Sequence, residues 1–325
     1  MEISAVSIDS LLGPSSERFF GSGYRRVEYV KGPARVLQRS ILSDVSCSVK
    51  IVPPTNWSTK KVGAQVPHLS TLDGIIVGAI FTECLVRNMF DISPADLASC
   101  RIAGMSIKAP RRPVEDDLGN VQVHTRVTEW RTTSEDSAEL VTETSVGGMM
   151  VSTRVEIPSI SVEQARGLVE PRHDGLYGEL FRRRLIDIGN VELAGTSAHA
   201  AAHVHEDRES FAMVESLDSR RADKLTLVDA FVIGLQLGQA ILYSMDDIRR
   251  EESNTLWMRS VELQSSREME DVDEDIAAHA SIVNPRIIRK GQQVWRAGTI
   301  SASVGGISFR CAVAHQLPVS QGVNQ

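Results

Sequence analysis

The sequence predicts an α+β fold made of two similar halves, each with a long buried helix followed by antiparallel strands. Two long apolar segments, 68–91 and 224–247, align with each other without a gap. The strand-like segments that come after them align as well, in the same order. The repeating unit therefore spans about half of the 325 residues, which indicates a duplicated domain rather than a solenoid of short repeats.

The first apolar segment, HLSTLDGIIVGAIFTE at 68–83, predicts a helix with protein on every side. A surface helix has one apolar stripe and a polar opposite face, but no polar side chain occurs between Gly74 and Phe81. The aligned segment KLTLVDAFVIGLQLGQ has the same character. We expect helices over 68–90 and 224–246, and we expect them to be the two longest in the chain.

Three strand-like segments follow each helix at matching positions. They are RIAGMSIKAP and WMRSVELQSS, VQVHTRV and IAAHASI, and VGGMMVSTRVEI and VGGISFRCAVAH. The last pair alternates apolar and polar residues, as a strand with one buried face does. Gly147 and Gly148, like Gly305 and Gly306, fall where such long strands need a bulge or a sharp bend.

One apolar helix followed by a curled antiparallel sheet that wraps it is the hotdog architecture. The repeat therefore predicts a tandem double hotdog whose two sheets pair into one. The segment IPSISVEQARGLVEPRHDG, at 157–175, has prolines toward both ends and is the expected connection. We accordingly assign residues 1–160 to an N-terminal hotdog domain and 161–325 to a C-terminal hotdog domain. Cover from the sheet and from the other half explains why both helices are apolar all round.

Polar residues open both helices. Ser70 and Asp73 in the first copy fit a capping box, with a hydroxyl at the N-cap and a carboxylate three positions later. Thr226 and Asp229 fit the same pattern in the second copy, and capping alone is a sufficient role for both carboxylates. The functional alternative is that a buried helix N-terminus polarises a thioester or ketone carbonyl and stabilises an oxyanion or enolate. An adjacent Asp or His would then move the protons.

The two copies differ at two polar positions, as expected for a duplicated enzyme that keeps one working site. His68 aligns with Lys224, and Glu83 aligns with Gln239. A carboxylate in an apolar helix is expected to have a raised pKa, which suits a general base near neutral pH. The structural alternatives are a hydrogen bond between Glu83 and a neighbouring strand or backbone group, and a solvated or capping role for His68.

Composition and charge argue against several classes of function. A net charge of −7 gives no electrostatic reason to expect a nucleic-acid partner. The N-terminus, MEISAVSIDSLLGPSSERFF, lacks the pattern of a secretory signal, and no apolar run reaches the roughly 18 residues of a membrane span. The four cysteines have no metal or redox spacing. We expect a soluble cytoplasmic protein without a membrane or nucleic-acid partner.

The histidines give little sign of a metal site. His199, His203 and His205 alternate along AHAAAHVH, so a strand places them on one face, but no carboxylate or cysteine motif lies nearby. His124 and His279 occupy matching strand positions, which favours a structural role. We therefore expect no metal.

Two segments resemble the avirulence D protein (AvrD) family of plant-associated and related bacteria. They are LLGPSSERFFGSGYRRVEYV at 11–30 and PHLSTLDG at 67–74, and the resemblance in length extends over the whole chain. The family is associated with the synthesis of syringolides, which are acyl-sugar lactone elicitors. The resemblance implies a reaction that joins a β-ketoacyl thioester to a ketopentose such as xylulose, followed by ring closure.

The A-factor butyrolactone synthases are similar in outline to what this resemblance implies. They also resemble tandem hotdogs and condense a β-ketoacyl chain with a small hydroxyketone. This chain lacks the histidine-rich motif, similar to HPFFFDH, of that second family. Only the chemistry is therefore shared, and the site residues are chosen from the internal repeat.

The hypothesis is a cytoplasmic acyl-transferring and condensing enzyme of the hotdog superfamily. The acyl chain is expected to lie along the helix between the two copies, with its thioester carbonyl at a helix N-terminus. Glu83 or Asp73 is the expected base, and His68 is the proton shuttle or hydrogen-bond donor. Asp229 completes the catalytic set from the second copy. The expected substrate-binding residues are Ser70, Lys224, Thr226 and Gln239.

Substrates and partners follow from this hypothesis. The donor is an acyl thioester of coenzyme A or of an acyl carrier protein, with no other cofactor, and a carrier protein is a possible partner. The chain is either a monomer with an internal pseudo-dimer or a homodimer. One alternative is a hotdog dehydratase, hydratase or thioesterase, since LTLVDA at 225–230 is similar to the Asp-bearing helix start of polyketide dehydratases. The other is a non-catalytic protein that binds an acyl metabolite.

Overall fold

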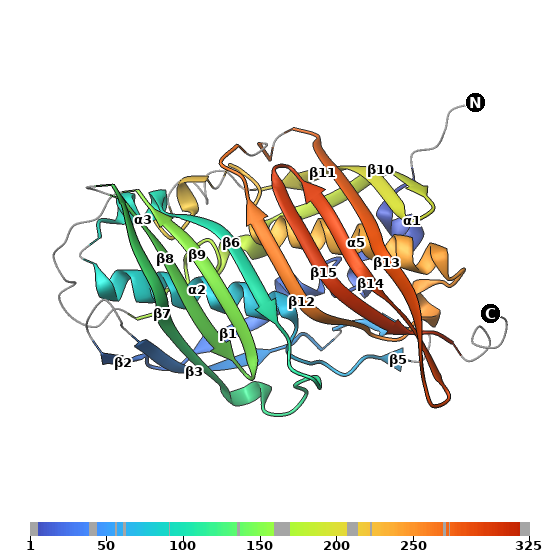
Figure 1. Ribbon diagram of the computed structural model, residues 1–325, viewed down its shortest axis with the longest axis horizontal. Coiled ribbons are helices and arrows are strands. Elements are labelled where there is room, and N and C mark those ends of the chain that lie inside the picture. Colours follow the sequence, from blue (N-terminus) through green and yellow to red (C-terminus); the bar gives the residue numbers. More distant parts are fainter. Residues whose placement is uncertain are drawn as a thin grey trace.

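The computed structural model describes residues 6–318, apart from 39–43, 56, 61–62, 91, 135–136, 159–169, 207–213, 222, 269–270 and 273. Most of the connection expected at 157–175 lies outside the described residues, as does the expected domain boundary between residues 160 and 161. The described residues on either side form two similar halves, which lie next to each other along the long axis of the molecule (Figure 1).

Thirteen strands form one antiparallel sheet that curves around two long helices (Figure 1). The strand order is β1-β3-β7-β8-β9-β6-β12-β15-β14-β13-β11-β10, with β2 paired to β3. The bounds are β1 Glu28–Lys31, β2 Arg35–Gln38, β3 Asp44–Val52, β6 Arg101–Lys108, β7 Val121–Ser134, β8 Ser137–Val146, β9 Met149–Ile157, β10 Leu185–Ala194, β11 Ser197–His205, β12 Leu256–Ser265, β13 Ile276–Lys290, β14 Gln293–Val304 and β15 Ile307–Gln316. Two short strands, β4 (Thr59–Lys60) and β5 (Gly63–Ala64), pair with each other outside this sheet.

The order of the strands is the same on both sides of the centre of the sheet. β6 and β12 each follow a long helix, and they pair with each other antiparallel, with Gly104 opposite Gln264 and Lys108 opposite Ser260. Going outward, β9, β8, β7, β3 and β1 in one half correspond to β15, β14, β13, β11 and β10 in the other. The double hotdog is therefore confirmed, and its two sheets join into one as the sequence predicts.

Each half wraps one long helix, α2 (Thr71–Met89) or α5 (Leu227–Met245). Both lie within the helices expected at 68–90 and 224–246, and at 19 residues each they are the longest among the described residues. Every residue of α2 except Arg87 is buried, which confirms cover on all sides. α5 is long and apolar enough to cross a bilayer, but 89% of its most apolar stretch is buried inside the protein, which accounts for its composition.

Glycines let both helices approach the sheet closely. Gly78 and Gly234 occupy aligned positions in α2 and α5. A Cβ at Gly78 would lie 2.8 Å from Cγ1 of Val151, and one at Gly234 would lie 3.0 Å from Cδ1 of Phe309. A side chain at either position would push the helix away from the strand beneath it, which explains why both copies have glycine there.

The two glycine pairs form hairpin turns, where the sequence predicts a bulge or a sharp bend within a long strand. Gly147 and Gly148 join β8 to β9, with φ of 54° and 84°. Gly305 and Gly306 join β14 to β15, with φ of 49° and 84°. A two-residue hairpin turn of this kind needs positive φ at both positions, which glycine adopts without steric cost. The strands therefore end at these glycines instead of continuing through them.

A further repeat lies in the segments that precede β1 and β10. PSSERFFGSGYRR and PRHDGLYGELFRR align without a gap. The N–H of Tyr24 donates to the carbonyl of Phe19 (2.9 Å), and the aligned N–H of Phe181 donates to that of Leu176 (3.0 Å). The rings of Tyr24 and Phe181 stack on each other, with centroids 6.4 Å apart. The duplicated unit is thus longer than the aligned helices and strands alone indicate.

The N-terminal segment of the chain packs on the second half. Helix α1 (Ile8–Leu12) contacts α5 and β10, and the N–H of Val191 in β10 donates to the carbonyl of Val6 (2.8 Å). Residues that the sequence assigns to the N-terminal domain therefore cover the helix of the C-terminal domain.

The other short helices are α3 (Pro94–Ser99) and the 3-10 helices η1 (Ser15–Glu17), η2 (Gly23–Arg26), η3 (Leu118–Asn120), η4 (Leu180–Arg183), η5 (Ser219–Arg221) and η6 (Arg250–Glu252).

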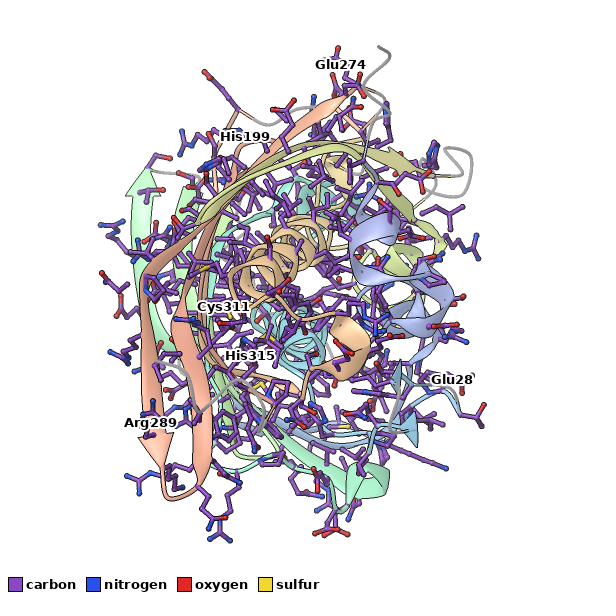
Figure 2. The ribbon with its side chains drawn as sticks, turned by 90° about the vertical axis from the view of Figure 1, so that its right-hand side faces the viewer. Glu28, His199, Glu274, Arg289, Cys311 and His315 are labelled. Carbon is purple, nitrogen blue, oxygen red and sulfur yellow. The ribbon has the colours of Figure 1, made fainter. Side chains whose placement is uncertain are left out.

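The view along the long axis shows the helices inside the curved sheet (Figure 2). Cys311 and His315, both on β15, lie toward the interior and are fully buried. Glu28, Glu274 and Arg289 lie at the periphery and are exposed. The buried apolar side chains between the helices and the sheet form one cluster that runs through both halves. The two halves therefore share a single core.

Candidate active site

Two adjoining cavities lie at the N-terminal end of α2, where the two halves meet. The smaller has a volume of about 70 Å³ and the larger a volume of about 310 Å³. Four residues line both cavities: His68, Ser70, Leu256 and Met258. The first two precede or cap α2 and the other two belong to β12, so both halves contribute to the shared wall.

The smaller cavity is the more polar of the two and carries cationic side chains. Its cationic lining residues, besides His68, are Arg18, Lys60 and Arg250. Aromatic side chains also line it, namely Phe19, Phe20, Trp57 and Tyr243. No carboxylate is among its described lining residues, so its electrostatic field favours anionic or electron-rich groups.

The larger cavity is mainly apolar. Its apolar lining residues are Leu69, Ala109, Pro110, Pro113, Val114, Met149, Leu256, Trp257, Met258, Trp295 and Ala314. Three exposed arginines, Arg111, Arg112 and Arg259, also line it. Its volume and composition suit a flexible apolar chain, with cations available where the cavity reaches solvent.

His68 stands between the two cavities and contacts two indole rings. The centroid of its ring is 5.5 Å from that of Trp57, which lines the smaller cavity, and 5.6 Å from that of Trp257, which lines the larger. Its Nδ1 lies 3.3 Å from the carbonyl oxygen of Val66. When Nδ1 donates to this carbonyl, Nε2 carries no proton and can accept one. His68 is thus positioned to move protons at the junction of the cavities.

Uncharged oxygens hold Lys60 and Arg250 in the smaller cavity. Nζ of Lys60 donates to the carbonyl (3.0 Å) and the hydroxyl (3.1 Å) of Ser253. Arg250 donates to the carbonyl of Glu17 and to the hydroxyl of Ser58, both at 2.9 Å. Burial, and after it the charge of Arg250, lowers the pKa of Lys60 to about 8. Burial lowers the pKa of Arg250 as well.

Arg18 and α5 complete the smaller cavity. The guanidinium of Arg18 pairs with Asp9 and also donates to the side-chain oxygen of Gln236 on α5. Gln239 and Tyr243, which follow on α5, line the cavity themselves. Residues four apart lie on one face of a helix, so α5 presents this face to the start of α2.

The structure brings His68 together with Gln239 of the second copy and not with Glu83. His68, Ser70 and Gln239 all line the smaller cavity. Glu83 is on the same helix as Ser70 but lies about 20 Å farther along it, at 1.5 Å per residue. The start of α2 and the later part of α2 cannot share one site, so the helix of the other half supplies the facing side chain.

Protein fills the space around Glu83. Its Oε2 accepts a hydrogen bond from the N–H of Leu217 (3.0 Å), and its Oε1 lies 3.9 Å from the guanidinium of Arg87. Ser216 and Leu217 are fully buried, and Glu83 lines neither of the two cavities. Burial raises the pKa of Glu83, and the Leu217 N–H opposes this. The backbone hydrogen bond is the structural alternative that the sequence allows for this residue.

Asp73 lies behind the cavities as the capping carboxylate of α2. Its Oδ2 accepts from the N–H (2.7 Å) and the hydroxyl (2.9 Å) of Ser70, and its Oδ1 accepts from the hydroxyl of Tyr29 (2.6 Å). The capping box expected from the sequence is therefore present. Asp73 is fully buried and lines neither cavity, whereas Ser70 lines both.

Replacing Asp73 by Asn is expected to cost most stability in acid. Burial raises the pKa of this carboxyl, against the hydrogen bonds from Tyr29 and Ser70. The folded state then holds the proton more tightly than the unfolded state, so this group's contribution to stability is greatest below about pH 3.9 and falls as the pH rises through the folded-state pKa. Asn does not ionise, so the difference in free energy of unfolding between parent and variant shrinks from pH 4 to pH 8 in urea titrations.

The same variant separates capping from catalysis. Asp73 is the third residue of α2, where an amide oxygen can accept the hydrogen bonds from Ser70 as a carboxylate does, and it lines neither cavity, so we expect turnover to be retained. A variant that melts near the parent but loses roughly a hundredfold in rate would instead make Asp73 a general acid or base.

The cap of α5 contains a buried ion pair. Asp229 accepts from the N–H (2.9 Å) and the hydroxyl (2.8 Å) of Thr226, which completes the second capping box. Arg184 pairs with Asp229 and, at 2.7 Å, with Glu206. Arg184 and Asp229 are fully buried. Asp229 therefore has a charged partner where Asp73 has the neutral hydroxyl of Tyr29.

Of the residues expected from the second copy, only Gln239 lies with His68 and Ser70. Lys224 pairs with Asp271 and lines neither cavity. Thr226 serves the cap of α5 and also lines neither cavity. The structure thus assembles half of the expected site and places the rest at the opposite end of the internal pair.

The histidines of the second half lie on the outer face of the sheet. His199, His203 and His205 are exposed on β11, and His203 pairs with Asp275. The ring of His199 lies against that of His279 on β13, with centroids 4.5 Å apart. No group of three or more possible metal ligands occurs in the part of the chain that the structure describes.

Sequence reasoning did not identify the cations of the smaller cavity. Lys60 and Arg250 lie in short elements between the long helices and strands, where no periodic pattern marks them. Arg18 is in PSSERFFGSGYRR, and the residue aligned with it in the second copy is Gly175. This difference between the two copies is the one sequence signal that could have identified Arg18.

Comparison with known proteins identifies a family. The family model described as Pseudomonas avirulence D protein (AvrD) matches residues 3–318. No curated protein matches the chain.

Several solved structures are similar over most of the chain. A conserved protein of unknown function with hot dog fold from Alicyclobacillus acidocaldarius is 7% identical, covers 92% of this chain and 98% of its own, and has a TM-score of 0.37. A dehydratase from work on the borrelidin and fluvirucin polyketide synthases is 11% identical, with 89% and 95% covered and a TM-score of 0.36. A MaoC-like dehydratase is 10% identical, with 74% and 82% covered and a TM-score of 0.34. Identities this low do not transfer a function to this chain.

Proposed function

Because the chain belongs to the Pseudomonas avirulence D protein (AvrD) family, we propose that it is a biosynthetic enzyme that condenses a β-ketoacyl thioester with a ketose such as xylulose. The product is an acyl-sugar lactone of the syringolide type. The observation that carries the proposal is the pair of adjoining cavities at the start of α2, one apolar and one polar. A reaction between an acyl chain and a sugar needs such a pair, with the reacting carbonyl where the two meet.

The larger cavity suits the acyl donor. Its walls are apolar, and exposed Arg111, Arg112 and Arg259 suit the phosphates of a pantetheine arm. The donor is an acyl thioester of coenzyme A or of an acyl carrier protein, and no other cofactor takes part. Acyl thioesters are cytoplasmic metabolites, so the enzyme acts in the cytoplasm. Both walls of the site come from one chain, so the internal pair of hotdogs supplies what a homodimer would.

The smaller cavity suits the ketose, and His68 suits the proton transfers. A hydroxyl of the ketose attacks the thioester carbonyl and passes its proton to Nε2 of His68, which returns the proton to the departing thiolate. This step forms a β-keto ester and a free thiol. The carbon between the two carbonyls then loses a proton to the same base and attacks the ketone of the sugar. The ketone oxygen takes up the proton, and the ring is closed.

The start of α2 supplies electrostatic stabilisation. The first N–H groups of a helix have no acceptor within the helix and form the positive end of its dipole. Ser70, the N-cap, lines both cavities, so this end of α2 faces their junction. A thioester carbonyl placed there is polarised, and the oxyanion formed from it is stabilised. Asp73 holds the N-cap in this geometry from behind.

Product analysis tests the proposal directly. The purified protein is incubated with a β-ketoacyl thioester and xylulose, and the products are identified by mass spectrometry. We expect an acyl-sugar adduct and one equivalent of free thiol. Free acid without an adduct would indicate a thioesterase. In parallel incubations without the sugar, loss of water from a β-hydroxyacyl thioester or its addition to an enoyl thioester would indicate a dehydratase or hydratase. Binding of the thioester without turnover would indicate a protein that only binds acyl metabolites.

A further inference from the structure

Two cations in the smaller cavity, Lys60 and Arg250, are held by uncharged oxygens, and the exposed carboxylate of Glu17 acts on Arg250 without forming a salt bridge. Two carbonyls and a hydroxyl hold Lys60, while one carbonyl and one hydroxyl hold Arg250. These oxygens satisfy hydrogen bonds but carry no net charge. Within the described part of the chain, no carboxylate forms a salt bridge with either side chain.

Such an arrangement is unfavourable until an anion binds. Arg250 is 8% exposed, and its charge acts on Lys60 through the same cavity. Two like charges that are removed from water repel each other and lose hydration. A bound anion reverses both effects, and it forms charge-assisted hydrogen bonds that are stronger than those to uncharged oxygens.

The size of the cavity restricts the anion. A water needs about 10–15 Å³ of such volume, so about 70 Å³ is room for about five waters. This suits one tetrahedral anion such as a phosphate group, and the carbon chain that carries it would extend to the junction with the larger cavity, whereas a nucleotide or an acyl chain does not fit. An acyl chain has the larger cavity beside it. Two cations match a dianion better than a single carboxylate.

We propose that Lys60 and Arg250, beside His68, form a subsite for a phosphate monoester, and that the ketose used by this enzyme carries that phosphate. The identity of the acceptor rests on the proposed function, while the subsite rests on the cavity itself. A phosphate monoester carries between about 1.5 and 2 negative charges at pH 7 and presents three acceptor oxygens. The other source of the same group is the phosphate of coenzyme A or of a phosphopantetheine arm.

The opposite end of the internal pair differs at two of the aligned positions. Gly175 stands at the position aligned with Arg18, and Glu83 stands at the position aligned with Gln239. Glu83 accepts a hydrogen bond from the N–H of Leu217, and both residues are buried. A carboxylate at this position would repel a phosphate. One phosphate subsite per chain is therefore expected.

Calorimetric titration of the full chain tests the subsite without any need for turnover. The probes are inorganic phosphate, xylulose 5-phosphate, xylulose and coenzyme A. We expect xylulose 5-phosphate to bind at least about tenfold more tightly than xylulose, because charge-assisted hydrogen bonds are gained, and we expect inorganic phosphate to compete with it. If coenzyme A alone competes with inorganic phosphate and the two sugars bind equally, the phosphate belongs to the donor and the proposal for the acceptor is overturned.

Two substitutions assign the effect to the cations. Lys60→Met is expected to reduce the affinity for xylulose 5-phosphate to near that for xylulose. Arg250→Lys keeps a charge in place of a forked donor, so it should fold and give an intermediate affinity. Lys50→Met, which removes an exposed cation on β3, is the control and should bind as the parent does. Unchanged affinity in both cavity variants would overturn the subsite.

Failure of the subsite and failure of the proposed function give different results. If binding depends on phosphate but neither sugar yields an adduct, the subsite stands and the condensation is rejected. If xylulose yields an adduct and its phosphate neither binds more tightly nor reacts faster, the condensation stands and the subsite is rejected.

Discussion

Replacement of His68 by glutamine is expected to lower the rate of acyl-sugar formation by about 10²–10⁴-fold, because this is the usual contribution of a general acid or base. Glutamine keeps hydrogen-bonding groups but cannot carry a proton from one reacting group to another. His68 lies between Trp57 and Trp257 and makes one hydrogen bond, to Val66, so the fold should tolerate the change. Initial rates at saturating substrate, with thermal melts of both proteins, measure the two effects separately.

Glu83→Gln is the matched control for this experiment. The sequence alone makes Glu83 a candidate base, and on that hypothesis the substitution removes turnover. In the structure the side chain lines neither cavity and accepts from the Leu217 N–H, which a glutamine oxygen can also do. We therefore expect a rate close to that of the parent. A large loss in Glu83→Gln together with an active His68→Gln would move the reaction to the other end of the internal pair.

The long helices and the strands after them can be predicted from the sequence because each signal occurs twice. Gly78 and Gly234 are one example, since the same close approach to the sheet demands glycine in both copies. The capping boxes are another, because Ser70 and Thr226 occupy the same position in the two copies. The turn at Gly147 is harder to predict, because a glycine pair between two extended segments fits a bulge as well as a hairpin.

The site could be predicted only in part, because an alignment of the two copies compares equivalent positions. The candidate site combines positions that are not equivalent: the start of α2 and the later part of α5. His68 and Gln239 stood out as differences between the copies, but nothing in the sequence indicates that they face each other. Lys60 and Arg250 come from short irregular segments, whose placement depends on tertiary contacts with Ser253 and Ser58.

The two ends of the internal pair differ in how their polar side chains are used. At the first end, the helix cap has a neutral partner in Tyr29, and Lys60 and Arg250 line an open cavity without a salt bridge. At the second end, the N–H of Leu217 binds Glu83 and a buried ion pair secures the cap, with Arg184 between Asp229 and Glu206. The open end keeps polar groups available for a ligand, and the closed end uses them on each other. Substitutions at the first end should therefore affect mainly turnover, and substitutions at the second end should affect mainly stability.

Loss of Arg184 is expected to have the largest effect on stability of any single substitution considered. Arg184→Met removes the cation that pairs with Asp229 and Glu206, whose side chains are 0% and 4% exposed. Removing one partner of a buried ion pair leaves an uncompensated charge, and the usual cost is about 3–5 kcal/mol in free energy of unfolding. Urea denaturation of the parent and the variant measures the difference.

The cap of α2 provides the comparison for this result. Tyr29→Phe removes the neutral donor to Asp73 and is expected to cost about 1 kcal/mol, the usual net worth of one hydrogen bond. Adding Asp229→Asn and Glu206→Gln to Arg184→Met removes the orphaned charges and should restore part of the lost stability, because the three groups act as one network. If Arg184→Met costs no more than Tyr29→Phe, then charge compensation is not what holds the closed end together.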